Sequence, residues 1–124
     1  MTPLELLAIA GAGGAGAVAR FAAGLLDRAR PERATMAVNV VASLLAGFCT
    51  TLLPLDETWR AVLITGFCGG FSTYSAFAVQ VVELAERRRA GLVAATVALT
   101  LVGGAAAAGL GMLLGALLVP ASAI

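Results

Sequence analysis

The sequence predicts an all-helical integral membrane protein with four transmembrane helices. Of its 124 residues, 60% are hydrophobic and only 12% are charged, whereas charged residues make up roughly a quarter of an ordinary globular domain. The charged residues separate long apolar stretches, and each stretch is long enough as a helix to cross a bilayer. We therefore expect one membrane domain over residues 1–124, with spans at about 4–26, 34–53, 59–84 and 91–119.

The composition also excludes several classes of function. The net charge of +1 gives no indication of nucleic-acid binding. An enzyme is not expected, because the sequence has no histidine, no paired carboxylates within a span and no metal-ligand cluster. Cys49 and Cys68 both fall within apolar spans, and we interpret them as small buried thiols. Glu5, with no positive charge before the first apolar run, argues against a cleaved signal peptide.

The first span begins with signals for a helix N-terminus. Thr2 can cap the helix, Pro3 suits its first turn, and Glu5 sits where a capping box places it. Arg20 is the exceptional residue of this span, about 9 Å from the helix end by the helical rise. A charged residue inside a span is a functional candidate. The alternative is an arginine whose guanidinium reaches the nearer interface, and position alone leaves both interpretations open.

The second span carries a polar pair. Asn39 and Ser43 are four residues apart, so they share one helical face. A buried amide has two donor hydrogens and must find partners. Asn39 is therefore either a polar contact between helices, which is the commoner use, or a ligand for something that crosses the membrane.

The third span contains the stretch that organises the chain, residues 66–77. Three glycines in five positions each cost about 1 kcal/mol of helix propensity relative to alanine. The hydroxyls of Ser72, Thr73 and Ser75 then compete for backbone partners. We predict a helix break at mid-membrane, where freed carbonyls can bind cations and freed N–H groups can bind anions. Close packing of the glycines against a neighbouring helix is the alternative interpretation.

Two further pairs lie after the predicted break. Tyr74 and Phe77 share a helical face, and such aromatics ordinarily pack, although their electropositive ring edges can also meet an anion. Thr96 and Thr100 form a polar pair in the fourth span. A stripe of small residues at four-residue spacing in the same span indicates a helix–helix contact. The stripe comprises Gly103, Ala107, Gly111 and Gly115.

Taken together, three stretches resemble the Fluc (CrcB-type) fluoride channels. Residues 13–21 resemble the family's first-helix signature, which ends near an arginine, here Arg20. Residues 35–39 resemble its second-helix motif, and residues 66–77 resemble its glycine-rich break with hydroxyls and two aromatics. Three motifs in this order, in a four-span chain of this length, make a specific signal. Tyr74 departs from the pattern, because the family usually has phenylalanine there.

The resemblance implies a channel of the cell (inner) membrane that exports fluoride passively and relieves fluoride toxicity. It implies an antiparallel dimer with two pores, and Arg20 near the entrance. It also implies a structural Na⁺ on the dimer axis, held by the backbone carbonyls of Gly69 and Ser72. The implied fluoride path comprises Asn39, Tyr74, Ser75 and Phe77, and we expect Thr96 and Thr100 to extend it.

Two other functions compete with this interpretation. A small four-helix drug/proton antiporter should carry an acidic residue within its first span for proton exchange, but Glu5 lies at the end of the span and Arg20 lies inside it. A non-transporting membrane assembly subunit would explain the small-residue stripes. It would not explain the polar residues and the broken helix together.

The arginines predict the orientation of the chain. Six of them flank the first and third loops, which lie on one side of the membrane, against one near the second loop. Basic loops stay cytoplasmic, so both termini should be outside. An antiparallel dimer needs both orientations, and we therefore hypothesise a homologous partner chain with the opposite arginine bias. Insertion in both orientations, giving a homodimer, is the alternative. The six arginines are Arg28, Arg30, Arg33, Arg87, Arg88 and Arg89.

Overall fold

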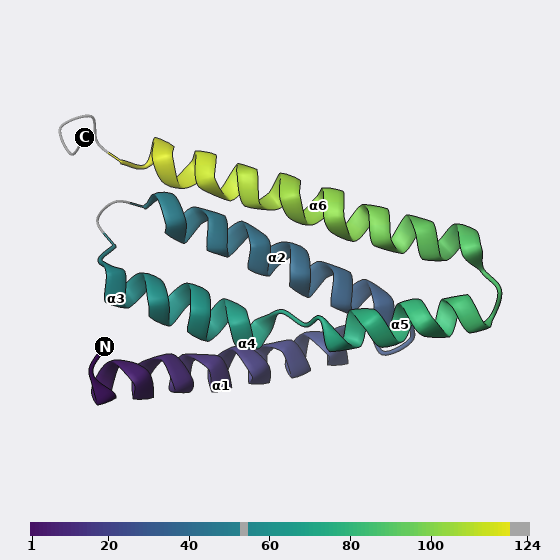
Figure 1. Ribbon diagram of the computed structural model, residues 1–124, viewed down its shortest axis with the longest axis horizontal. Helices are drawn as coiled ribbons and strands as arrows, with labels where there is room; N and C mark the ends of the chain where they lie inside the picture. The colour runs from purple at the N-terminus through teal and green to yellow at the C-terminus, as the bar shows by residue number, and fades with distance from the viewer. Residues whose placement is uncertain (53–54, 120–124) are drawn as a thin grey trace.

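The structure is a computed structural model that describes residues 1–52 and 55–119. Within these residues the helices form four spans, each antiparallel to the one before it (Figure 1), and all four are long and apolar enough to cross a membrane. The predicted multi-pass, all-helical fold is confirmed. The elements are α1 (Pro3–Leu26), α2 (Pro31–Thr51), α3 (Glu57–Arg60), η1 (Ala61–Cys68), α4 (Gly69–Phe71), α5 (Ser75–Glu86) and α6 (Ala90–Leu117).

Local signals set the helix ends. Thr2 forms the predicted capping box, since its Oγ1 accepts the Glu5 N–H at 3.2 Å and its own N–H donates to the Glu5 carboxylate at 2.8 Å. Asp56 caps α3 by accepting the N–H three residues further on at 2.9 Å. The helix α2 begins at Pro31, three residues before the predicted start, because proline suits the first helical turn. The predicted end of that span, Leu53, lies outside the described residues.

The spans pack in two pairs, and small residues bring the backbones together in each. In the α1 seam, between α1 and the third span, Gly16 lies against the backbone of Phe67 and Gly70 against that of Gly13. In the α6 seam, between α2 and α6, the predicted small-residue stripe is confirmed, because most of it is buried against α2. Its buried members are Ala107, Gly111 and Gly115.

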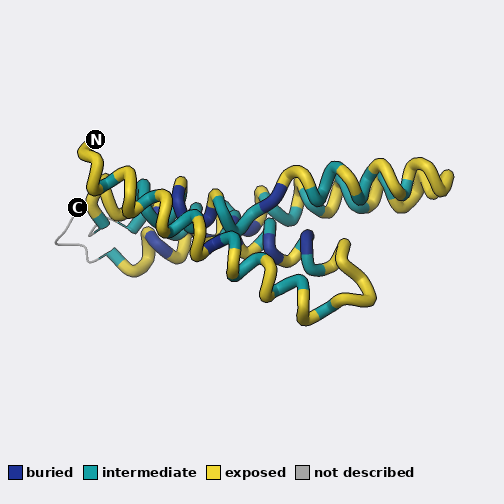
Figure 2. Tube along the Cα trace, turned by 90° about the horizontal axis from the view of Figure 1, so that it is seen from below, coloured by how far each residue is buried: buried dark blue, intermediate teal, exposed yellow. Residues whose placement is uncertain are grey.

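Large apolar side chains lie mostly on the outside of the bundle. Leu7 and Phe21 of α1 are each 69% exposed, and Figure 2 shows short buried segments along spans that are otherwise intermediate or exposed. Such a surface suits lipid, whose tails are as apolar as leucine. Cys49 and Cys68 are buried and free, as predicted.

The predicted break in the third span is confirmed at residues 72–74, between α4 and α5 (Figure 1). The glycines themselves are helical: Gly69 has φ −62° and ψ −39°, whereas Ser72 has ψ 161°. Gly66 and Gly70 instead pack against α1, so the alternative interpretation of the glycines also holds. The propensity cost of the glycines is a weak effect that this packing overrides. The interruption therefore begins after the glycines, at the hydroxyl residues.

Candidate ion pathway

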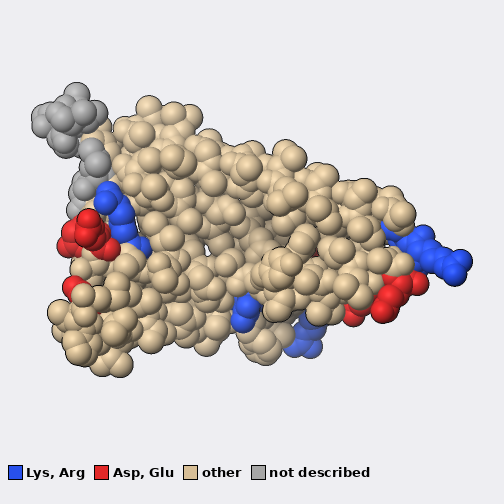
Figure 3. All heavy atoms as spheres, in the orientation of Figure 1, with Lys and Arg blue, Asp and Glu red and all other residues tan. Residues whose placement is uncertain are grey.

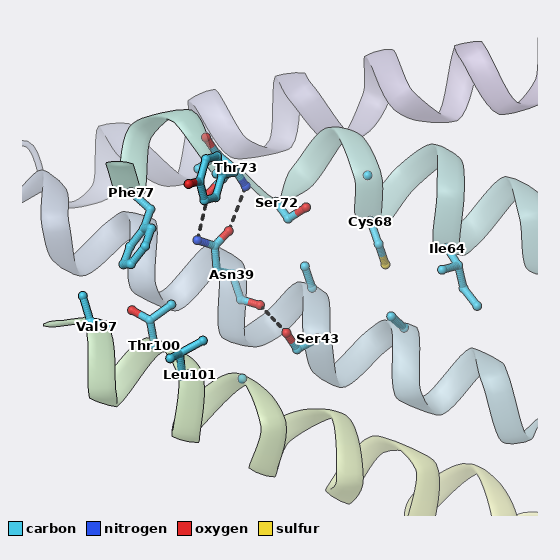
Figure 4. Close-up of a pocket in the computed structure, with 15 residues that line it drawn as sticks. Asn39, Ser43, Ile64, Cys68, Ser72, Thr73, Phe77, Val97, Thr100 and Leu101 are labelled. Atoms are coloured by element: carbon cyan, nitrogen blue, oxygen red, sulfur yellow. Dashed lines mark hydrogen bonds between the residues drawn. The ribbon is translucent and has the colours of Figure 1, made fainter. Parts of the chain in front are cut away.

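Asn39 joins α2 to the break in the third span. Its Oδ1 accepts the N–H of Thr73 at 2.8 Å, and its Nδ2 donates to the carbonyl of Thr73 at 2.9 Å (Figure 4). One side chain therefore satisfies both backbone groups of a buried residue that belongs to no helix. Of the two interpretations of Asn39, the structure shows the polar contact between spans. This contact uses one of the two Nδ2 hydrogens as a donor.

A cavity of about 540 Å³ lies between α2, the third span and α6. Figure 4 shows Asn39, Phe77 and Thr100 facing this space from three different elements. The cavity brings together six of the nine residues singled out from the sequence. They are Asn39, Gly69, Ser72, Tyr74, Phe77 and Thr100.

Neutral groups make the wall of this cavity. Among the described residues that line it, none is Asp, Glu, Lys or Arg. The rings of Tyr74 and Phe77 have centroids 6.4 Å apart and planes inclined at 49°. Tyr74 is 81% exposed, so its ring lies at the open side of the cavity. The arrangement can offer an amide N–H, hydroxyls and ring edges to an anion without placing a full charge beside it.

Two residues of the predicted fluoride path lie outside the main cavity. Thr96 lines a second cavity of about 210 Å³ near the α5–α6 connection, and Ser75 lines a third, of about 370 Å³. Gln80 lines both of these smaller cavities and donates from Nε2 to Thr35 Oγ1 at 2.9 Å. Sequence reasoning missed Gln80. Its position three residues after Phe77, on the same helical face, was the available signal.

Thr73 is the most informative residue that sequence reasoning left out of the site. It is 8% exposed, and its Oγ1 accepts the N–H of Ala76 at 3.1 Å. Because Tyr74 already has helical dihedral angles, Thr73 caps the start of the helix after the break. Threonine just before a helix is a preferred cap, and that preference could have identified it.

Arg20 reaches the break from α1. Its Nη1 donates to the carbonyl of Ser72 at 3.4 Å, and the residue is half-buried. The guanidinium thus contacts the break itself. The side chain therefore has a partner within the fold and is not simply extended to the interface.

The carbonyl oxygens of the break bear on whether a hard cation such as Na⁺ can be held here. Carbonyl oxygens are the ligands that such a cation prefers, and the Ser72 carbonyl already accepts a hydrogen bond from a cationic guanidinium. The residue Gly69 lines the same cavity as Ser72. The chemistry of these groups is therefore compatible with the Na⁺ implied by the family resemblance.

Comparison with known proteins decides the family. Residues 7–112 match the family model described as CrcB-like protein, Camphor Resistance (CrcB). The chain belongs to the CrcB family. Its CrcB relatives include proteins named fluoride-specific ion channel FluC 1 in three organisms. The one from Leifsonia xyli subsp. xyli is 44% identical over 96% of this chain and 92% of its own length.

The other two relatives confirm that the similarity extends over most of the chain. The protein from Mycobacterium bovis is 41% identical, and the aligned region covers 73% of this chain and 74% of the length of that protein. The protein from Yersinia pestis is 34% identical, and the aligned region covers 79% of this chain and 83% of the length of that protein. These CrcB proteins bear the name of an ion channel, which is a non-enzymatic function.

Proposed function

We propose that this chain is a fluoride-specific channel of the cell membrane through which fluoride leaves passively, relieving fluoride toxicity. The similarity to a relative named as a fluoride-specific channel over 96% of the chain carries the proposal. The neutral cavity beside a helix break, lined by an amide, hydroxyls and aromatic rings, supports it.

The decisive experiment is efflux from liposomes that contain the purified protein. Fluoride should leave and chloride should not. Liposomes without protein give the background leak. Equal efflux of both anions, or none of either, would contradict a fluoride-specific channel.

The proposed path runs past Asn39, Tyr74, Phe77 and Thr100 and continues along Ser75 and Thr96. Fluoride is small and strongly hydrated, so the path must replace water with donors while letting the ion escape. The second Nδ2 hydrogen of Asn39, the hydroxyls and the ring edges are neutral donors that meet both needs. Thr96 and Thr100 lie four apart on one face of α6 and line two successive cavities, which supports a continuous track.

The proposed assembly is an antiparallel dimer with two pores and a Na⁺ at its axis, held by the Gly69 and Ser72 carbonyls. The main cavity is open on one side, where Tyr74 is 81% exposed, and a second copy would close it. A central cation would also offset the cost of an anion in a medium of low dielectric constant.

The proposed partner within that dimer is a homologous chain of opposite orientation. The α1–α2 and α5–α6 connections lie at the same end of the bundle (Figure 1), and basic side chains extend from the α5–α6 end (Figure 3). Six of the eight basic residues flank these two connections, which favours one direction of insertion. The alternative is a homodimer formed by insertion in both directions.

Labelling of a single cysteine decides between these partners. A cysteine placed at the C-terminus of a variant that lacks Cys49 and Cys68, expressed alone in intact cells, should react from the outside only. A cysteine in the α5–α6 connection is the matched control and should react only once the membrane is permeabilised. Equal labelling of the C-terminus from both sides would reject a fixed orientation and favour the homodimer.

A further inference from the structure

Two side chains divert the backbone hydrogen bonds that would keep the third span helical. In an α-helix each carbonyl accepts the N–H four residues later, so the carbonyls of Gly69 and Ser72 would accept from Thr73 and Ala76. The Thr73 N–H donates instead to Asn39 Oδ1 at 2.8 Å. The Ala76 N–H donates instead to Thr73 Oγ1 at 3.1 Å.

The two carbonyls that lose these partners are the two in the proposed sodium site. We propose that Asn39 and Thr73 are positioning residues of that cation site: the Asn39 amide keeps the Gly69 carbonyl out of its helical hydrogen bond, and the Thr73 hydroxyl does the same for the Ser72 carbonyl. The inference rests on the proposed Na⁺ site, and it gives both residues a role apart from contact with fluoride.

The local backbone makes such diversion necessary. Gly69 (φ −62°, ψ −39°) and Tyr74 (φ −88°, ψ −39°) on the two sides have helical angles, so a continuous helix would require a change only in the residues between them, where Ser72 has ψ 161°. A backbone N–H without a partner is costly inside a membrane. If the amide or the hydroxyl is removed, the freed N–H therefore gains most by returning to its helical carbonyl. That hydrogen bond would then have to be broken before a cation could bind.

The contact from Arg20 supports this view of the Ser72 carbonyl. Its guanidinium donates to that oxygen at 3.4 Å, from a different span. An oxygen engaged in a helical hydrogen bond would attract a second, distant donor less strongly. The Ser72 carbonyl is thus available to a partner outside its own helix, and a cation that binds this oxygen would replace the guanidinium.

The test compares Thr73→Val, which keeps the shape and removes the hydroxyl, with Thr73→Ser, which keeps the hydroxyl. Thermal unfolding of the purified protein is followed while sodium replaces N-methyl-D-glucamine at constant ionic strength, since a bound cation raises the unfolding temperature by an amount that grows with the logarithm of its concentration relative to its dissociation constant. A helical hydrogen bond contributes about 0.5–1.5 kcal/mol, so Thr73→Val should weaken apparent sodium affinity roughly two- to tenfold. Thr73→Ser should stay close to wild type.

Asn39→Leu tests the other half of the inference through the Gly69 carbonyl. It should also weaken the sodium response, and it keeps the proposal testable if Thr73→Val does not fold. A purely structural role would lower the unfolding temperature without sodium and leave the sodium-dependent shift unchanged in both variants, which overturns the inference.

The same titration separates this inference from the proposed function. If wild-type stability does not depend on sodium, the cation site and the inference both fail, while fluoride efflux from liposomes still tests the channel. If wild type responds to sodium and both Thr73 variants respond equally, the positioning role fails and the cation site stands. A weaker response in Thr73→Val than in Thr73→Ser supports the inference.

Discussion

The third span and α6 are both rich in glycine, yet they differ in continuity. The helix α6 runs unbroken for 28 residues although it contains more glycines than the third span. The third span stops being helical only after its glycines, at residues 72–74. The two spans differ in their hydrogen bonding. In the third span, the side chains of Asn39 and Thr73 accept hydrogen bonds from backbone N–H groups at the break. In α6, Gly111 and Gly115 lie against the backbone of α2.

The comparison teaches that glycine and side-chain hydrogen bonding do different things in this fold. Glycine allows two backbones to approach closely, which a continuous helix can exploit. Polar side chains from a neighbouring helix can interrupt a helix, because they offer its backbone groups other partners. The third span shows close glycine packing followed by side-chain hydrogen bonding to its backbone, whereas α6 shows the close packing.

The largest expected effect concerns glycine packing in α6. A Cβ at Gly111 would collide with the backbone of Leu44, whereas a Cβ at Gly109 would meet nothing within 4 Å. Gly111→Ala should therefore destabilise the protein by about 1–3 kcal/mol through overpacking. The matched change Gly109→Ala should be neutral or stabilising by up to about 1 kcal/mol, through helix propensity. Thermal unfolding measures both, and equal effects would contradict the assigned α6 seam.

An intermediate effect is expected just after the break. Phe77→Ile keeps the bulk of the side chain and removes the electropositive ring edge, so fluoride flux should slow by roughly two- to tenfold. The proposed dimer should remain assembled, as size-exclusion chromatography would show. Leu99→Ile on α6 is the control and should leave flux unchanged. Wild-type flux through a correctly assembled Phe77→Ile protein would remove Phe77 from the path.

The smallest effect is expected at Ser72. If its backbone carbonyl binds sodium, Ser72→Ala should change the apparent sodium affinity by no more than about twofold. Gly69→Val should weaken sodium binding, although a Cβ at Gly69 meets only Ile64 O of its own chain, at the ordinary contact distance of 3.9 Å. Sodium titration of thermal unfolding measures both variants. A large loss in Ser72→Ala would show that the hydroxyl, rather than the carbonyl, is the ligand.

Much of the fold could be predicted from the sequence because the signals are local. Apolar length determines a membrane span. The N-terminal signals at Thr2 and Asp56 determine helix starts whatever the surroundings, since the caps bond to their own first turn. The small-residue stripe of α6 predicted a contact, because close approach in lipid requires small side chains.

The tertiary structure alone decided where the third span breaks and what Asn39 contacts. The glycines predicted a break within residues 66–77, but at the observed interruption the Thr73 N–H donates to Asn39, a residue 34 positions away in the sequence. The same holds for Arg20, whose contact with Ser72 spans 52 positions. Gln80 and Thr35, 45 positions apart, meet in the same way. A pattern in one segment reports its own periodicity and propensity, whereas the partner that an unpaired backbone group finds depends on which segment the fold places beside it.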